Sequence, residues 1–297
     1  MKNHLLFPTK KVSFDNILKT QIVILGIKWT MSSQLIEGWS TPNLYGLLFV
    51  SGLIIGFYVM KRIFKAEGIP EEWLDKLLIY IVVATIVGAR LGHVFFYDWH
   101  IYRENPIDIF KVWEGGLASH GGAIAILIAL IIFSKVVSKK SVWWILDRIV
   151  APIAIAACFI RLGNLVNHEI IGNPTTMPWG FMFMHESIDN LVEVNGEMVH
   201  VYRHPAQLYE ALAYLLSFFI LLRLHWKTNL KEKSGFLFGL FLVFIFGWRF
   251  IIEFVKVGQA ERDAGLIINT GQWLSIPFVI AGIILMLLAW RNKLNVK

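Results

Sequence analysis

The sequence has few of the residues that a soluble or disulfide-bonded protein needs. It contains one cysteine, Cys158, so no disulfide can form within the chain. Only 16% of its residues are charged, against about 25% in a typical soluble domain. A surface built from so few charges would be mostly apolar. These shortages exclude a soluble globular domain, a disordered chain and a disulfide scaffold.

Hydrophobic residues, by contrast, make up 56% of the 297 residues, and the mean hydropathy is +0.60. A transmembrane helix needs about 20 predominantly apolar residues. Seven stretches meet this requirement: about 43–60, 75–97, 115–134, 141–161, 205–223, 235–255 and 268–290. The sequence therefore predicts an all-α integral membrane protein with about seven transmembrane helices.

Lysine and arginine are unevenly distributed around these helices. The regions after the first, third and fifth helices, together with the C-terminal end, carry 15 of them, whereas the regions after the second, fourth and sixth carry 6. Cytoplasmic loops of membrane proteins are enriched in Lys and Arg. We therefore expect the N-terminus outside and the C-terminus in the cytoplasm. The same enrichment accounts for the net charge of +7, so no nucleic-acid partner is expected.

The regions outside the helices divide into an N-terminal stretch and one long loop. Residues 1–42 hold five lysines on the outer side, so we expect a separate segment there, with an amphipathic stretch at about 14–36 on the membrane surface. Residues 43–297 form the membrane domain. It includes the longest loop, about 162–204, which we expect to form a small extracytoplasmic α/β cap.

A β-hairpin is expected inside this cap. The stretches Leu191–Val194 and Glu197–Tyr202 flank the pair Asn195-Gly196. Asn-Gly is typical of the type I′ turn that joins two antiparallel strands, because both residues tolerate positive φ angles.

The densest polar stretch lies at the outer end of the fourth helix and reads Arg161-Leu-Gly-Asn164-Leu-Val-Asn167-His168-Glu169-Ile-Ile-Gly172. Arg161 and Asn164 are three residues apart, on one helical face. An arginine that anchors the helix at the headgroups, followed by a polar cap, would give the same pattern. His168 and Glu169 resemble the start of the zinc motif His-Glu-x-x-His, but Gly172 replaces the second histidine. We therefore expect no metal site.

Four further polar motifs lie near outer helix ends or in the outer half of the membrane: Tyr45-Gly46, Ser119-His120-Gly121-Gly122, His204-Pro-Ala-Gln-Leu-Tyr-Glu210 and Arg249-Phe-Ile-Ile-Glu253. Each has a structural alternative. His120 can be a packing residue beside two glycines, and Arg249 and Glu253, four residues apart, can form an ion pair. The convergence of all five motifs on one side of the membrane favours a functional site.

These residue types indicate phosphate chemistry. Guanidinium groups form bidentate, charge-assisted hydrogen bonds to phosphate oxygens, and a histidine can accept a proton at neutral pH. Cys158 lies among apolar residues and no Gly-x-Ser-x-Gly motif is present, so a nucleophile on the protein is not expected. The residues favour an intramembrane enzyme that acts on a phospholipid headgroup and takes its nucleophile from a second substrate.

Two other classes remain open at this point. The same arginines would suit a non-enzymatic phospholipid or anion transporter, although the internal repeat common in transporters is not visible. An intramembrane protease would need a Ser-His or paired-Asp site within the helices, and the one aspartate found there, Asp147, is on the cytoplasmic side.

The stretch 161–172 resembles the signature of the prolipoprotein diacylglyceryl transferase family, bacterial enzymes that lipidate lipoprotein precursors. The resemblance runs from about residue 43 to 290. The N-terminal stretch before it, about 40 residues, is longer than is usual in the family. Ile245 departs from the family pattern, which usually has a tyrosine there. The other matching motifs follow in the family's order: Tyr45-Gly46, Gly88-Ala-Arg90-Leu-Gly, Ser119-His120-Gly-Gly, Pro174-Thr175, Pro178-Trp179, His204-Pro-Ala-Gln-Leu-Tyr-Glu210 and Arg249-Phe-Ile-Ile-Glu253.

The resemblance implies a reaction between two substrates in the bacterial cytoplasmic (inner) membrane. The diacylglyceryl group of phosphatidylglycerol would move to the lipobox cysteine thiol of a prolipoprotein signal peptide, forming a thioether and releasing glycerol phosphate. Besides membrane lipids no other partner is implied, and neither a metal nor an organic cofactor. The residues implied as catalytic are His120, Arg161 and Arg249. Those implied in substrate binding are Tyr45, Arg161, Asn164, Glu169, Gly172, Arg249 and Glu253.

The orientation can be tested with topology reporters. A reporter fused after Lys140 or at Lys297 should report the cytoplasm, and one inserted near Asn195 should report the outer side, because the loop charges differ as described. A cytoplasmic signal at Asn195 would contradict an outward-facing site.

Overall fold

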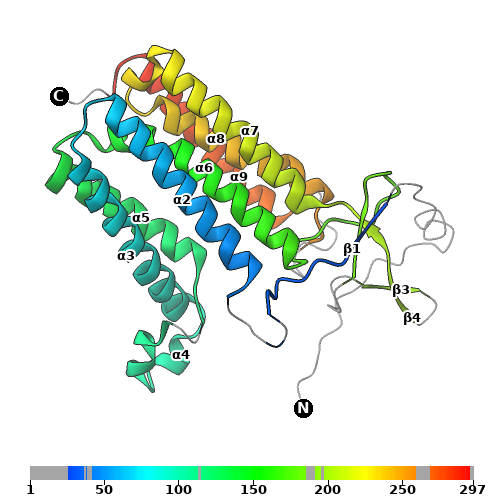
Figure 1. Cartoon of the computed structure of the whole chain (residues 1–297). Helices are drawn as coiled ribbons and strands as arrows, with labels where there is room; N and C mark the ends of the chain where they lie inside the picture. The colour runs from blue at the N-terminus through cyan, green and yellow to red at the C-terminus, as the bar shows by residue number, and fades with distance from the viewer. Residues whose placement is uncertain are drawn as a thin grey trace. The chain divides into compact units, whose positions relative to one another are not determined.

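The computed structural model describes residues 26–36, 38, 42–112, 115–184, 191–194, 197–258 and 268–294. Long helices dominate it, and a few short strands form the cap (Figure 1). In the described part of the chain, seven helices are long and apolar enough to cross a membrane. They are α2 (Leu44–Ala66), α3 (Glu71–Phe96), α5 (Ser119–Phe133), α6 (Val142–Val166), α7 (Ala206–Lys227), α8 (Phe236–Ile252) and α9 (Thr270–Trp290). The predicted all-α membrane fold with seven spanning helices is confirmed.

Short helical turns complete or connect these helices. The π-helical turn η3 (Ser134–Ser138) continues α5, and the 3₁₀ turn η6 (Glu253–Val255) continues α8. The other short elements are α4 (Trp99–Tyr102), η1 (Pro106–Phe110) and η5 (Asn229–Glu232).

The helix boundaries differ from the expected ones at a few ends. Helix α2 continues past Lys61 to Ala66, and α6 continues past Arg161 to Val166. Both charges have acidic partners, because Lys61 pairs with Glu71 and Arg161 with Glu210. Helix α5, in contrast, begins only at Ser119. Gly115 and Gly116 before it have φ angles of +91° and +70°, which do not fit a right-handed helix.

The chain forms two compact units. The first takes in described residues of Met1–Gly56, Ile153–Arg223 and Gly239–Ile284, and the second those of Phe57–Pro152, Leu224–Phe238 and Leu285–Lys297. The polar stretch 161–172 and the cap strands belong to the first unit. Helices α3 and α5, with His120, belong to the second.

The cap contains two small sheets. In the first, β2 (Phe181–Phe183) lies between β1 (Ile27–Trp29), which is parallel to it, and β5 (Tyr202–Arg203), which is antiparallel. In the second, β3 (Leu191–Val194) pairs with β4 (Glu197–His200), Leu191 lying opposite His200. The two strands of the predicted hairpin are confirmed, although Tyr202 joins the other sheet. The expected turn at 195–196 lies outside the described residues.

The N-terminal stretch differs from the expected division of the chain at residue 42. Residues 1–25 of the expected surface segment lie outside the described residues. The chain then enters the cap sheet as β1, where Ile27 is paired with Phe181 and Trp29 with Phe183. The cap therefore includes part of the N-terminal stretch, because the backbone groups of β1 bond to β2.

Helices α3 and α5 of the second unit approach each other through glycine. A Cβ atom on Gly121 would lie 2.3 Å from the carbonyl oxygen of Gly88 and 2.6 Å from the Cα atom of Gly92. Only glycine permits this separation. At Gly121, next to His120, the absence of a side chain therefore admits the backbone of α3.

Charged side chains inside the second unit bond to backbone groups. The Arg90 guanidinium donates to the carbonyl of Ile109 at 2.8 Å and that of Gly115 at 2.6 Å. The Asp147 carboxylate accepts from the backbone N–H of Gly235 at 2.6 Å and of Phe238 at 2.8 Å, and so caps the start of α8. These bonds satisfy charges that would otherwise be costly within a membrane.

An ion-pair network lies just beyond the end of α2. The Glu67 carboxylate lies 2.6 Å from a terminal guanidinium nitrogen of Arg148 and 3.0 Å from Nε2 of His225. Burial by itself raises the pKa of Glu67, but the hydrogen bonds and charges of His225 and Arg148 outweigh it and lower that pKa to about 2. Glu67 therefore stays ionised and paired at neutral pH.

Candidate functional site

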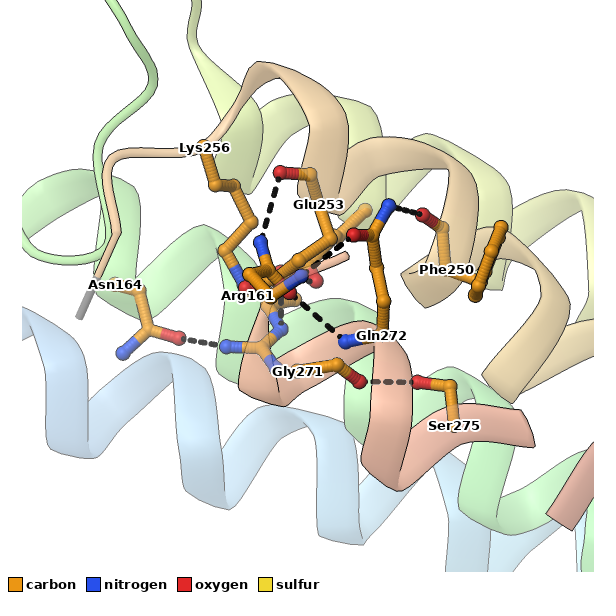
Figure 2. A network of polar contacts seen from close by, with 10 residues as sticks. Arg161, Asn164, Phe250, Glu253, Lys256, Gly271, Gln272 and Ser275 are labelled. Atoms are coloured by element: carbon orange, nitrogen blue, oxygen red, sulfur yellow. Dashed lines mark hydrogen bonds and ion pairs between the residues drawn. The ribbon is translucent and has the colours of Figure 1, made fainter. Parts of the chain in front are cut away.

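The site in the first unit is built around Arg161, near the C-terminal end of α6. Its Nε lies 2.8 Å from an oxygen of Glu210, whose side chain on α7 is fully buried. One terminal nitrogen of Arg161 donates to Oδ1 of Asn164 at 3.0 Å, and a further side-chain hydrogen bond joins Arg161 to Tyr214. Arg161 and Asn164 therefore share a helical face as predicted, and Figure 2 shows the hydrogen bond between them. Glu210 and Tyr214 hold the guanidinium as well.

Glu169 is held by amide groups. The Nδ2 group of Asn164 donates to one carboxylate oxygen at 2.9 Å, and that of Asn167 donates to the other at 3.0 Å. Asn164 thus links Arg161 to Glu169 in one hydrogen-bonded chain. Gln207 of α7 donates to the backbone carbonyl of Glu169. The motif that the sequence singled out is therefore a continuous network in the structure.

Lys256 is a site residue that the sequence reasoning missed. Its side chain is 4% exposed, and Nζ lies 3.0 Å from Glu253 and 3.6 Å from Glu210 (Figure 2). Glu210 therefore contacts both Arg161 and Lys256. The three-residue spacing of Glu253 and Lys256 was a sequence signal for their pairing, but only the fold brings Glu210 to them.

The possible ion pair between Arg249 and Glu253 is not formed, and this corrects the sequence expectation. Helix α8 ends at Ile252, and Glu253 opens the 3₁₀ turn η6. The Glu253 carboxylate bonds to Lys256 instead. Within the described part of the chain, Arg249 forms no hydrogen bond or ion pair, and its buried Nε has no partner.

Tyr45 and Gly172 shape the surroundings of these charges. The Tyr45 ring lies against Gly163, where a Cβ atom would be 2.7 Å from it, and Tyr45 interacts electrostatically with Glu169 and Arg161. At Gly172 a Cβ atom would lie 2.4 Å from the carbonyl oxygen of His204. Both glycine positions therefore require the absence of a side chain, which sets the shape of the site.

His204 adds a neutral imidazole to the first unit. Its Nδ1 lies 3.1 Å from the hydroxyl of Tyr209, which also accepts a hydrogen bond from the indole N–H of Trp179 at 2.8 Å. Burial lowers the pKa of His204, which favours the uncharged form at neutral pH.

His120 opens α5 in the second unit. Its imidazole is exposed and packs edge-on against Phe96, with ring centroids 5.2 Å apart, and at 5.7 Å from Tyr97. The exposed ring can accept a proton from a molecule at the outer end of α5. The first unit contains the other site residues expected from the sequence, namely Tyr45, Arg161, Asn164, Glu169, Gly172, Arg249 and Glu253.

The charges around Arg161 are unevenly paired in the described residues. Arg161 and Lys256 share the carboxylates of Glu210 and Glu253. Tyr214 interacts electrostatically with both arginines, Arg161 and Arg249. Among the described residues Arg249 is the arginine of this pair without an acidic partner. A partly buried guanidinium in this state suits a bound anion such as phosphate.

Comparison with known proteins gives the family. The model of the prolipoprotein diacylglyceryl transferase family matches residues 36–288. The chain belongs to this family. Its relatives include the phosphatidylglycerol–prolipoprotein diacylglyceryl transferases of Tolumonas auensis, 48% identical over 89% of this chain and 98% of the relative, and of Porphyromonas gingivalis, 46% identical over 91% and 97%. The resemblance seen in the motifs is confirmed.

The charge balance of the site can be tested by unfolding. We expect Lys256→Met to lower the melting temperature in detergent, because it leaves two buried carboxylates with one counter-charge fewer, a cost of about 3–5 kcal/mol. The double variant Lys256→Met/Glu253→Gln should recover most of that loss. Lys76→Met, at an exposed position on α3, is the matched control. If the double variant melts no higher than the single one, the pairing of Lys256 with Glu253 does not stabilise the fold.

Proposed function

We propose that this protein transfers the diacylglyceryl group of phosphatidylglycerol to the lipobox cysteine thiol of a prolipoprotein signal peptide. The thiolate sulfur attacks the glycerol carbon that bears the phosphate, the carbon–oxygen bond breaks, and glycerol phosphate leaves with the electron pair. The partly buried guanidinium of Arg249, which has no acidic partner among the residues that the structure describes, lies beside the Arg161 network and carries the proposal. The names of the relatives, which specify phosphatidylglycerol and prolipoprotein, support it.

The arginines act on the phosphate in this proposal. As the carbon–oxygen bond breaks, a phosphodiester becomes a monoester and gains negative charge. Arg249 donates to these oxygens, and it accelerates the step if it binds them more strongly in the transition state than in the ground state. Arg161 is held in place by Glu210, Asn164 and Tyr214, so it presents a fixed positive charge to the same group.

The remaining residues of the first unit hold the lipid headgroup. We assign this role to Tyr45, Asn164, Glu169, Gly172 and Glu253. Glu169 supplies acceptor oxygens, and Asn164 and Asn167 fix its carboxylate. The polar network and the two tight glycine contacts form a shaped polar surface, which suits a small hydroxylated headgroup.

His120 is the proposed base for the thiol. A cysteine thiol has a pKa of about 8.5 and is a poor nucleophile until it loses its proton. An exposed imidazole can accept that proton at neutral pH. The assignment rests on this chemistry and on the Ser119-His120-Gly121-Gly122 motif. The alternative role for His120 is to hold its ring contacts with Phe96 and Tyr97.

The proposed location is the bacterial cytoplasmic (inner) membrane, with the N-terminus and the cap outside and the C-terminus in the cytoplasm. Seven spanning helices and the distribution of Lys and Arg support this orientation. A non-enzymatic transporter is not favoured, because the relatives are named as transferases.

A direct assay tests the activity. Purified protein is incubated in detergent with phosphatidylglycerol and a synthetic lipobox peptide, and mass spectrometry follows the peptide. We expect the mass of one diacylglyceryl group to be added at the cysteine, and none when that cysteine is replaced by serine. An unmodified peptide under conditions in which the protein remains folded would overturn the proposed function.

Both arginines can be tested without removing charge. We expect Arg161→Lys and Arg249→Lys each to lose most of the activity, because lysine lacks the planar fork that binds phosphate at two points. Initial rates at saturating peptide are the measurement, and melting temperatures show whether each variant is folded. Near-normal turnover of either folded lysine variant would contradict a bidentate contact at that position.

The role of His120 can be separated by its pH dependence. If His120 is the base, His120→Ala should lower turnover about 10²–10⁴-fold and leave phosphatidylglycerol binding nearly unchanged. The loss should shrink as pH rises toward the pKa of the thiol, because more thiolate then forms unaided. His120→Gln is the control for hydrogen bonding and packing. A fully active Gln variant with the wild-type pH profile would rule out the base.

A further inference from the structure

Strand β1 contacts the polar motif from the opposite end of the chain. The indole N–H of Trp29 donates to the backbone carbonyl of Leu165 at 3.0 Å, in the last turn of α6. The Nε2 of His168 lies 2.8 Å from the carbonyl oxygen of Met31. Because a carbonyl oxygen only accepts, His168 is the donor in this bond. Two bonds thus attach residues 29–31 to the last turn of α6 and to the turn that follows it.

That turn has an unusual backbone. His168 and Ile170 have φ angles of +57° and +58°, in the left-handed region. This region is unfavourable for residues other than glycine, and most of all for a β-branched residue such as Ile170. Each such residue costs about 1–3 kcal/mol and persists only where surrounding contacts enforce it. The bonds from Trp29 and Met31 are among the contacts that can do so.

The strained residues stand on either side of Glu169. Their geometry directs the Glu169 carboxylate back to Asn164 and Asn167, and Asn164 in turn binds Arg161. A change in the turn would therefore move the Glu169 carboxylate relative to Arg161. His168, which bonds to the carbonyl of Met31, is the residue directly before Glu169 in the chain.

Strand β1 is itself rigidly held. It pairs with β2 over its three residues, and the Trp29 ring lies 5.3 Å from that of Phe181. Trp29 also packs against a buried apolar cluster of Leu165, Ile171, Phe181 and Phe183. The His168 ring lies edge-on to Phe183 at 5.6 Å. The same cluster therefore supports both the strand and the turn.

We propose that β1 and the residues directly after it form a positioning element of the site: the Trp29 indole and the carbonyl of Met31 fix the turn at His168 and so hold Glu169 against Asn164. Neither residue touches the substrate in this role. The inference rests on the proposed function, in which Glu169 holds the lipid headgroup. It extends the site to the N-terminal stretch. The competing explanation is that these bonds only cap α6 and stabilise the fold.

Trp29→Phe separates the two explanations, because it keeps an aromatic ring against Phe181 and removes the N–H donor. His168→Asn is the second variant: asparagine tolerates the left-handed region but lacks the imidazole that reaches Met31. Trp273→Phe is the matched control, since the Trp273 side chain on α9 is 60% exposed. The measurements are KM for phosphatidylglycerol, kcat and the melting temperature.

We expect KM to rise about fivefold in Trp29→Phe and in His168→Asn, the effect of one ordinary hydrogen bond, with kcat changed less than about twofold. In a Glu169→Gln background the Trp29→Phe change should add no further loss, because residues that act through one group are not additive. An unchanged KM with a lowered melting temperature, or a loss that adds fully to that of Glu169→Gln, would overturn the proposal.

Hydrogen exchange measures how firmly the turn is held, and it does not depend on the transferase reaction. Amides of residues 165–173 should exchange faster in Trp29→Phe than in Trp273→Phe, because the turn opens more often when one bond is lost. Equal exchange in the two variants would also overturn the proposal. If the wild-type protein forms no product but exchange still differs, the proposed function fails and the positioning role of β1 stands.

Discussion

The structure depends on one constraint: a charge placed among membrane-spanning helices must find a partner inside the protein. The pair of Arg161 and the fully buried Glu210, at 2.8 Å, is the central example. It joins α6 to α7, and Lys256 and Glu253 extend it to the end of α8. The proposed phosphate site needs this arrangement, because an unpaired buried charge is costly. Glu210 and Glu253 reduce that cost because they pair with Arg161 and Lys256. In the proposal, Arg249 remains able to bind an anion.

The two units meet the constraint with different partners. In the first unit carboxylates and amides surround Arg161, and the network stays polar enough to receive a charged headgroup. In the second unit Arg90 bonds to the backbone carbonyls of Ile109 and Gly115, and Asp147 bonds to backbone amides at the start of α8. The side-chain partners in the first unit suit a reaction site. The backbone partners in the second unit suit a structural role, because backbone groups carry no net charge and stay in the same hydrogen bonds.

The residues of the site were predictable to different degrees. Arg161 and Asn164 were found because they are close in sequence, and helical spacing alone put them on one face. Lys256 was missed because its partner Glu210 lies on another helix, and no local pattern points from one to the other. The ion pair that helical spacing would allow between Arg249 and Glu253 is not formed, and the Glu253 carboxylate bonds to Lys256 instead. The bond between His168 and Met31, two residues after β1, joins residues 137 positions apart.

By itself the sequence determined that this is a membrane protein, its seven spanning helices and its family, since these follow from apolar length and from motifs that are local in the chain. The tertiary structure decided which carboxylate pairs with which cation and which guanidinium has no acidic partner among the described residues. It also decided how the N-terminal strand supports Glu169. These depend on distances of about 3 Å between side chains from different elements. A shift of one helical position changes such a contact completely, while it leaves hydropathy and motif spacing the same.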